Sequence, residues 1–198
     1  MGCLTPTVPL VFPEQGAFMR REALTAAEVA ALVGLDEGRV RKEVEHGFLG
    51  RTSPPRFSFA DLVYFDAVAM LDVELGVADR KKLHKLIASA LAGDRTPSRI
   101  EMGPALEVRL DRVAKDAEGK LARFESWKKR LVSGEAILGG EPVFPKSRLA
   151  VRHVGGMLLR GARREDLLED YPYLTEQDLE FAPIFAKAYP RMGRPRES

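Results

Sequence analysis

Helix-start signals recur along this chain, and they constrain its fold more than any other feature. Thr25-Ala-Ala-Glu28 has the spacing of a capping box, in which two side chains reciprocally satisfy free N–H groups of the first helical turn. Thr175-Glu-Gln-Asp178 is another cap signal, and Ser58 suits the same position before a further apolar run. Apolar residues recur at helical spacing behind each signal, so we expect a mainly α-helical fold.

Apolar periodicity and loop-forming residues predict the order of elements. Helices are expected over about 25–33, 36–46, 58–70, 78–91, 115–132, 149–160, 164–170 and 176–188. The segment 93–104 has loop composition, and ALEVRL after it alternates like a short strand. We therefore divide the chain into residues 1–95 with an N-terminal arm, a short strand and connecting helix over 96–132, a helical domain over 133–189, and a basic, flexible tail over 190–198.

Composition excludes several classes of protein. With 198 residues and a net charge of +2, the chain has no global basic field, so nucleic acid would have to meet a local patch. Cys3 is the only cysteine, which excludes a disulfide framework and favours a reducing compartment. The sequence has no signal peptide and no apolar run of membrane-spanning length. We expect a cytoplasmic protein with no membrane partner.

Motifs typical of catalysis are missing too. His46, His84 and His153 are scattered, without carboxylates or cysteines at metal-ligand spacing. The sequence contains no nucleophile elbow, no Walker A loop and no dinucleotide-binding glycine motif after a strand. We therefore expect that the protein is not an enzyme and needs neither a metal nor a cofactor.

The N-terminal third has the order of a winged helix-turn-helix: a capped helix, a tight turn at Gly34-Leu35, a second helix and a hairpin, or wing. The second helix of such a motif enters the major groove. The expected DNA contacts are basic residues of this helix and of the wing, namely Arg39, Arg41, Lys42, His46, Arg51 and Arg56. The helix also carries Glu37, Glu43 and Glu45, which are unfavourable near phosphates. They favour the alternative, a helical core motif with a solvated face of mixed charge.

A family resemblance supports the first of these interpretations. LTAAEVAALVGLDEGRVRKEVEHGFLGR, followed by RFSFADLVYFDAVAML, resembles the DNA-binding region of MerR-type regulators. That region has a first helix, a recognition helix, a wing and an F-S-x-x-D-L helix in this order, and FSFADL matches the last element. The resemblance implies that operator DNA is a partner and that a homodimer binds it.

The C-terminal third resembles a second family. ILGGEPVFPKSRLAV and the stretch from LLRGARREDLLEDYPYLT to Asp178 are similar to the bacterial domain-of-unknown-function family numbered 433. The matching residues are Ile137, Gly139, Gly140, Pro142, Val143, Arg148, Leu149, Val151, Gly161, Glu165, Leu168, Tyr171, Pro172, Leu174, Thr175 and Asp178. The family implies a small helical domain and an antitoxin of a toxin–antitoxin operon. With an N-terminal helix-turn-helix, such proteins resemble VapB-type antitoxins, which bind PIN-type ribonuclease toxins.

The backbone chemistry of residues 137–150 indicates a built connection. Gly139-Gly140 permit a reversal, and the flanking prolines hold Val143-Phe144 extended, ready to pair as a strand within the domain or across a dimer. Ser147 is suited to cap the helix that follows. Two departures from the family stand out. Lys146-Ser147 replaces Gly-Thr, which puts the glycine's special conformation in doubt, and Arg163 replaces a Ser or Thr cap.

Together these features predict an antitoxin that autoregulates its operon by binding DNA and occludes an acidic metal site on the toxin. The expected partner-binding residues are arginines, which pair with carboxylates: Arg148, Arg152, Arg163, Arg164, Arg191 and Arg194. For Arg163 and Arg164, ordinary surface ion pairs are the alternative. Two other functions remain open: a stand-alone MerR-like regulator with a dimerising or ligand-sensing C-terminal domain, and an interaction module that no longer binds DNA.

Overall fold

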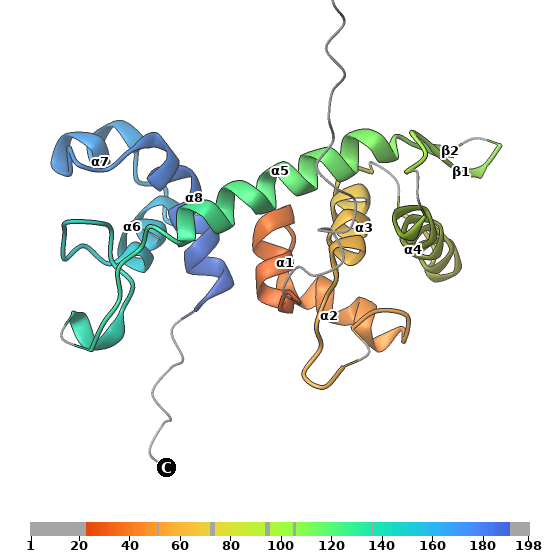
Figure 1. Ribbon diagram of the computed structural model, residues 1–198, viewed down its shortest axis with the longest axis horizontal. Helices are drawn as coiled ribbons and strands as arrows, with labels where there is room; N and C mark the ends of the chain where they lie inside the picture. The colour runs from red at the N-terminus through yellow and green to blue at the C-terminus, as the bar shows by residue number, and fades with distance from the viewer. Residues whose placement is uncertain are drawn as a thin grey trace, which may run out of the picture.

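A long helix joins two groups of shorter helices in the computed structural model (Figure 1). The structure describes residues 23–50, 52–71, 74–93, 96–104, 106–135 and 137–190. The expected N-terminal arm, nearly all of the basic tail, Arg51, Arg191 and Arg194 lie outside these residues. The helices are α1 (Ala26–Val33), α2 (Glu37–Glu45), α3 (Phe59–Met70), α4 (Val77–Ala92), α5 (Leu110–Lys128), α6 (Val151–Leu159), α7 (Arg164–Asp170) and α8 (Glu176–Ala188). α1 to α4 form the N-terminal group, α6 to α8 with the segment between α5 and α6 form the C-terminal group, and α5 joins the two (Figure 1). The described residues are therefore mainly helical, as predicted.

The N-terminal helices begin where the caps predict. Thr25 Oγ1 accepts from the Glu28 backbone N–H at 3.2 Å, and the Thr25 N–H donates to the Glu28 carboxylate at 2.9 Å. Gly34 closes α1 with a left-handed φ of 76°, and the Asp36 side chain caps α2. Ser58 and Asp61 form the same box at α3. The helix-start predictions for α1, α2 and α3 are confirmed.

The segment between α2 and α3 differs from the expected hairpin. Its two aromatic stretches do not pair with each other in the described residues. Instead, Phe57 forms an antiparallel bridge with Leu24, with N···O distances of 2.9 and 2.8 Å. Phe48 and Leu49 are buried in the core. Burial of these side chains holds the segment against the helices, while residues 52–56 are exposed.

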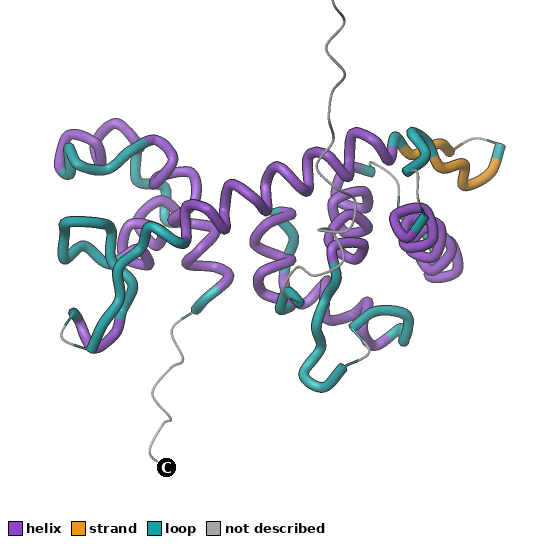
Figure 2. The backbone as a smooth tube through the Cα atoms, in the orientation of Figure 1, coloured by secondary structure: helices purple, strands orange, loops and turns teal. Residues whose placement is uncertain are grey.

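The segment 93–104, which was expected to be a loop, contains a strand. β1 (Ile100–Gly103) pairs antiparallel with β2 (Leu106–Val108), which makes the only sheet among the described residues (Figure 2). Ile100 and Met102 alternate inward, a pattern that the surrounding polar residues masked. The next helix starts at Leu110 rather than near 115, because Leu110 and Val113 continue its buried stripe.

In the C-terminal group, Gly139 and Gly140 adopt positive φ values of 66° and 88°, as the reversal requires. Val143 forms antiparallel bridges with Val132 and Ala150, so the extended segment pairs within the chain. Ser147 does not cap α6, whose N-cap residue is Ala150 and has no side-chain cap bond. The Ser147 hydroxyl instead donates to the Phe144 carbonyl at 3.0 Å and accepts from the Leu149 N–H at 3.2 Å, stabilising the turn before the helix.

One continuous core runs through both groups of helices. Trp127, near the end of α5, is almost fully buried among C-terminal aromatic residues. α8 packs against α6 on one side and against α1 on another. The C-terminal helices are therefore anchored both to α5 and to α1, the first helix of the described residues.

Lys146, at a position where the family pattern has glycine, adopts a left-handed backbone conformation. Its φ is 59°, in the left-handed region that costs a non-glycine residue roughly 1–2 kcal/mol. We therefore expect Lys146→Gly to raise the free energy of unfolding by about 0.5–1 kcal/mol, after allowing for glycine's greater chain entropy. Urea denaturation measures the change. Lys115→Gly, on the exposed face of α5, is the matched control and should lower stability by about 1 kcal/mol. A loss of stability in Lys146→Gly would contradict the argument.

Candidate nucleic-acid interface

Three of the predicted DNA-contacting residues lie together on the surface of α2 and its C-cap residue. Arg39, Lys42 and His46 are exposed and line one side of a groove of about 710 Å³. The opposite side comes from the end of α3, the segment after it and the start of α4, including Leu71, Glu74 and Arg80. The spacing of three and four residues places the basic side chains on one helical face. This face can meet an anionic surface as a unit.

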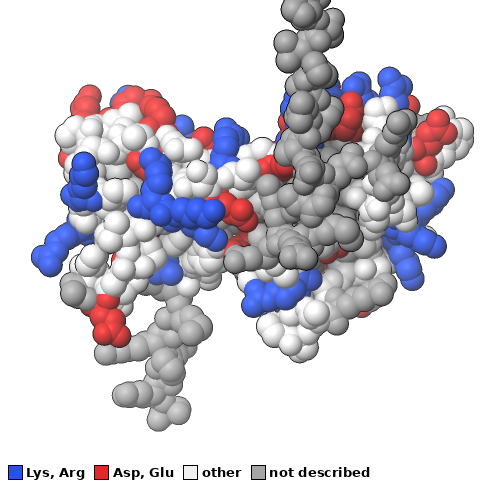
Figure 3. Space-filling model, in the orientation of Figure 1, with Lys and Arg blue, Asp and Glu red and all other residues white. Residues whose placement is uncertain are grey.

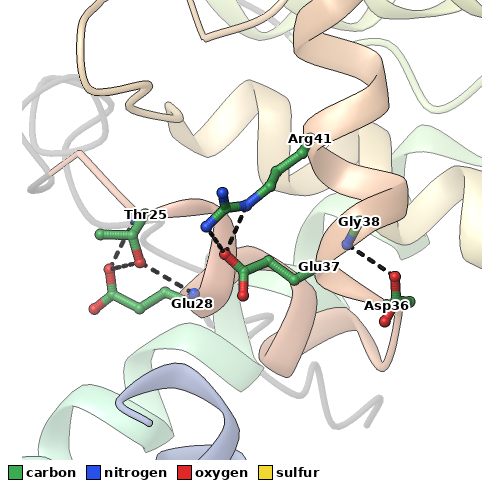
Figure 4. A network of polar contacts seen from close by, with 6 residues as sticks. All are labelled: Thr25, Glu28, Asp36, Glu37, Gly38 and Arg41. Atoms are coloured by element: carbon green, nitrogen blue, oxygen red, sulfur yellow. Dashed lines mark hydrogen bonds and ion pairs between the residues drawn. The ribbon is translucent and has the colours of Figure 1, made fainter. Parts of the chain in front are cut away.

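Arg41 is exposed, but its guanidinium is already paired with a carboxylate of the same helix. Its guanidinium donates to the Glu37 carboxylate from Nε at 2.9 Å and from Nη2 at 2.6 Å (Figure 4). This pair spans one turn of α2, with Glu37 N-terminal to the cation, the favourable orientation. Arg41 therefore carries a charge that its own helix already offsets.

Glu43 does not belong to the surface at all. Its side chain is only 2 % exposed and forms an ion pair with Arg80 of α4. The expectation that all three carboxylates of this helix oppose phosphates is therefore wrong for Glu43, because it points into the core. Tyr64 lies in the same cluster: burial first, and the Glu43 charge second, raise the pKa of its hydroxyl far above the ordinary value. The cluster fixes α2 against α3 and α4.

Arg56 faces another part of the molecule. It lines a cavity of about 260 Å³ where α1, α5 and the end of α8 meet, together with Glu28, Lys128 and Tyr189. The predicted set of DNA contacts therefore splits between two places. Sequence reasoning also missed Arg80, although the run DRKK at the start of α4 marks a basic surface. Figure 3 shows basic side chains over α4 at the right-hand side of the molecule.

The arginines expected to meet a protein partner differ in how they are engaged. Arg148 is exposed and makes no hydrogen bond or ion pair with the part of the chain that the structure describes. Arg152 is half-buried, with Nη1 2.7 Å from the Glu141 carboxylate and Nε donating to the Tyr189 carbonyl. It therefore stabilises the C-terminal group.

The arginines at the start of α7 have exposed carboxylate partners at long distances, and Arg164 Nη2 also donates to the Leu179 carbonyl at 3.4 Å. Arg163 Nε lies 3.6 Å from Glu165 and 3.9 Å from Asp166, and Arg164 Nη1 lies 3.5 Å from Glu176. As the sequence predicts, Arg163 occupies the N-cap position without a side-chain cap bond. Ion pairs this exposed contribute little to stability.

Comparison with known proteins gave a family match within the C-terminal third of the chain. Residues 132–186 match the family described as "Protein of unknown function (DUF433)". The segment comprises the pairing of Val132 with Val143, helices α6 and α7, and most of α8. Comparisons with curated proteins and with solved structures gave no match. The resemblance predicted for the C-terminal third is thus confirmed for this segment.

Two further features bear on the chemistry of the site. Within the described ranges, no group of three or more histidine, cysteine or acidic side chains is arranged to hold a metal ion. No helix in those same ranges combines the length and apolarity needed to cross a membrane.

Low pH should destabilise the fold, because two carboxylates that cap helices then become protonated. Burial alone would raise the pKa of Glu28, but hydrogen bonds from Tyr189 and Thr25 and the charge of Lys128 hold it below 4.5. The pKa of Asp61 is likewise lowered against the effect of burial, by His84 and Ser58. Because both folded-state pKa values are depressed, the stabilisation is complete above the unfolded-state values and is lost as pH falls through the folded-state values.

We therefore expect the free energy of unfolding to start to drop as pH falls below about 4.5, near the ordinary carboxyl pKa values, and to go on dropping until the lower folded-state values are passed. Chemical denaturation at a series of pH values measures the drop. Glu28→Gln should be less stable than wild type at pH 7 and should lose less stability on acidification. An identical pH profile in Glu28→Gln would exclude the assigned role of this carboxylate.

Proposed function

We propose that this protein is a DNA-binding antitoxin that represses its own operon and neutralises a ribonuclease toxin by direct contact. The N-terminal helices act as a MerR-like helix-turn-helix, with α2 as the recognition helix, and the C-terminal group contributes the toxin contact. A homodimer matches the two-fold symmetry of an operator. The observation that carries the DNA-binding part is the row of exposed basic residues on α2 beside a carboxylate that is turned inward.

Ion pairs within the protein decide which charged residues of α2 are available to contact DNA. Arg39 and Lys42 have no ion pair among the described residues, so both are available to phosphates and base edges. Arg41 has to leave Glu37 before it can contact DNA, which lowers its net contribution. Glu43 is offset by Arg80 and adds no repulsion. The remaining acidic side chains near this face are Glu45, which is exposed, and Asp36 and Glu74, which line the same groove.

A salt titration with single-residue variants tests the DNA contact. The probes are a duplex spanning the region upstream of the protein's own gene and a mixed-sequence duplex of equal length. Arg39→Ala and Lys42→Ala should each weaken binding roughly tenfold and reduce the salt slope by about one. Arg41→Ala should have a smaller effect, and Arg148→Ala, on the C-terminal group, should have none. If Arg39→Ala and Lys42→Ala keep the wild-type slope, α2 is not the DNA-contacting helix.

The antitoxin part rests on the family match of residues 132–186 and on Arg148, an exposed arginine at a family position. A guanidinium that has no ion pair among the described residues is suited to the carboxylates of a nuclease metal site. Co-expression with the adjacent gene product tests this contact. We expect the two proteins to co-purify and the neighbour's toxicity to be suppressed, with Arg148→Ala weakening both effects. If the neighbouring product neither binds nor impairs growth, the antitoxin function is excluded.

A second candidate is a stand-alone MerR-like regulator. The observation that favours it is the cavity of about 260 Å³ between α1, α5 and α8, where a small ligand would touch both groups of helices. In that case the protein alone would bind its operator with full affinity, and a partner protein would not change it. Measuring operator affinity with and without the neighbouring gene product separates the two functions.

A further inference from the structure

The C-terminal group lacks part of its own core, and α5 supplies it. Trp127 of α5 lies against three aromatic rings from beyond residue 140, with centroid distances of 6.5 Å to Phe144, 5.7 Å to Phe181 and 6.0 Å to Phe185. One turn earlier, Phe124 contacts Phe181 at 5.8 Å. Trp127 and Phe124 are each 1 % exposed, so these two side chains of α5 are buried against the aromatic residues of α8 and Phe144, while α1 packs on another side of α8.

A buried hydrogen bond fixes the position of α5 against the C-terminal group. The Trp127 indole Nε1 donates to Asp178 Oδ1 at 2.7 Å in the protein interior. The other carboxylate oxygen of Asp178 accepts from the Thr175 N–H at 2.9 Å, closing the capping box of α8. Arg130, just after α5, lies 3.2 Å from the same carboxylate. A single buried acid therefore recognises an indole N–H and a following cation, and its orientation is set by its own helix.

The family boundary separates the surface from the helix that covers it. The matched segment begins at residue 132, after α5 has ended at Lys128, and it contains Phe144, Asp178, Phe181 and Phe185. The aromatic surface and its acid thus lie within the family segment, whereas Phe124 and Trp127 do not. Such a surface would be exposed without the helix, and large exposed apolar patches mark interaction sites.

We propose that residues 132–190 are a helix-docking module, and that its occupant is α5, bound here within the same chain. The module selects an amphipathic helix with Phe and Trp three residues apart on one face and an arginine three residues after the Trp. It recognises these by aromatic packing and by the Asp178 carboxylate, the combination of apolar anchor and polar handle that makes Trp a frequent hot-spot residue. Covalent connection to α5 is not required for docking. This proposal is independent of DNA and toxin binding.

The experiment uses the full-length protein with a protease recognition sequence inserted between Glu135 and Ala136, beyond the end of α5. The folded protein is cleaved, and the fragments are analysed by size-exclusion chromatography. A fluorescent peptide of residues 109–133 is then titrated into the cleaved protein and followed by anisotropy. A peptide with Trp127→Ala is the matched control. Because the substitution is in the peptide, the folding of the protein is unaffected.

We expect the two fragments to elute together after cleavage. The wild-type peptide should exchange into the complex, and the Trp127→Ala peptide should bind roughly 100-fold more weakly. Asp178→Asn in the cleaved protein should reduce the preference for the wild-type peptide. The proposal is overturned if the fragments separate on cleavage, if the complex excludes the wild-type peptide, or if both peptides bind equally.

Discussion

Replacing Gly155 by alanine is expected to lower the free energy of unfolding by about 3 kcal/mol, near the upper end for overpacked cores. A Cβ atom at this position would lie 2.2 Å from the Ala182 carbonyl oxygen and 2.8 Å from the Ala186 Cβ. The clash is with the backbone of α8, which cannot rotate away as a flexible side chain can. α6 and α8 would have to separate, and their contact is the most extensive between any two described helices.

Gly156→Ala is the control, one residue further along the same helix. Its Cβ would meet only the end of the Arg160 side chain at 3.2 Å, a group that can move. Alanine is favoured over glycine inside helices by roughly 1 kcal/mol, so this variant should be neutral or more stable. Thermal unfolding should separate the pair, with Gly155→Ala melting roughly 6–12 °C below wild type. Equal melting temperatures would show that α6 and α8 approach less closely than described.

Asp178→Ala is expected to cost about 3 kcal/mol, because one carboxylate has several roles. The substitution removes the α8 cap, worth roughly 1 kcal/mol, and leaves the Trp127 N–H buried without a partner, which costs roughly 1–3 kcal/mol. The control is Asp170→Ala at the exposed end of α7, which should change stability by less than about 0.5 kcal/mol. Urea denaturation followed by tryptophan fluorescence measures both variants. Similar midpoints would contradict the assigned roles of Asp178.

Local signals in the sequence predicted most of the helices, because caps and apolar periodicity act within one turn. The capping boxes at Thr25 and Thr175 both form, and α7 and α8 have the predicted bounds. β1 was missed because a four-residue strand with two inward side chains resembles a polar loop when its partner is unknown. The early start of α5 was missed for a related reason: alternation in ALEVRL indicated a strand through Leu110.

The candidate site was predictable only in part, because its chemistry depends on pairing across the fold. Nothing near Glu43 in the sequence identifies Arg80, thirty-seven positions away, as its partner. Helical spacing predicted that Arg39 and Lys42 are exposed. The contacts of Arg152, in contrast, depend on Glu141 and on the residue after α8, which the sequence does not bring together. Lys146 shows the opposite case, in which the surrounding turn imposes a conformation that the residue itself disfavours.

The bond between Tyr189 and Glu28 also has a consequence for the order of folding. The two residues are separated by 161 positions, and the contact of α1 with α8 joins the first described helix to the last. Contacts this distant in sequence are slow to form, because a long loop must close first. During synthesis, α1 leaves the ribosome long before α8, the helix that packs against it. The nascent N-terminal half therefore carries an open surface until α8 has emerged from the ribosome and packed against α1.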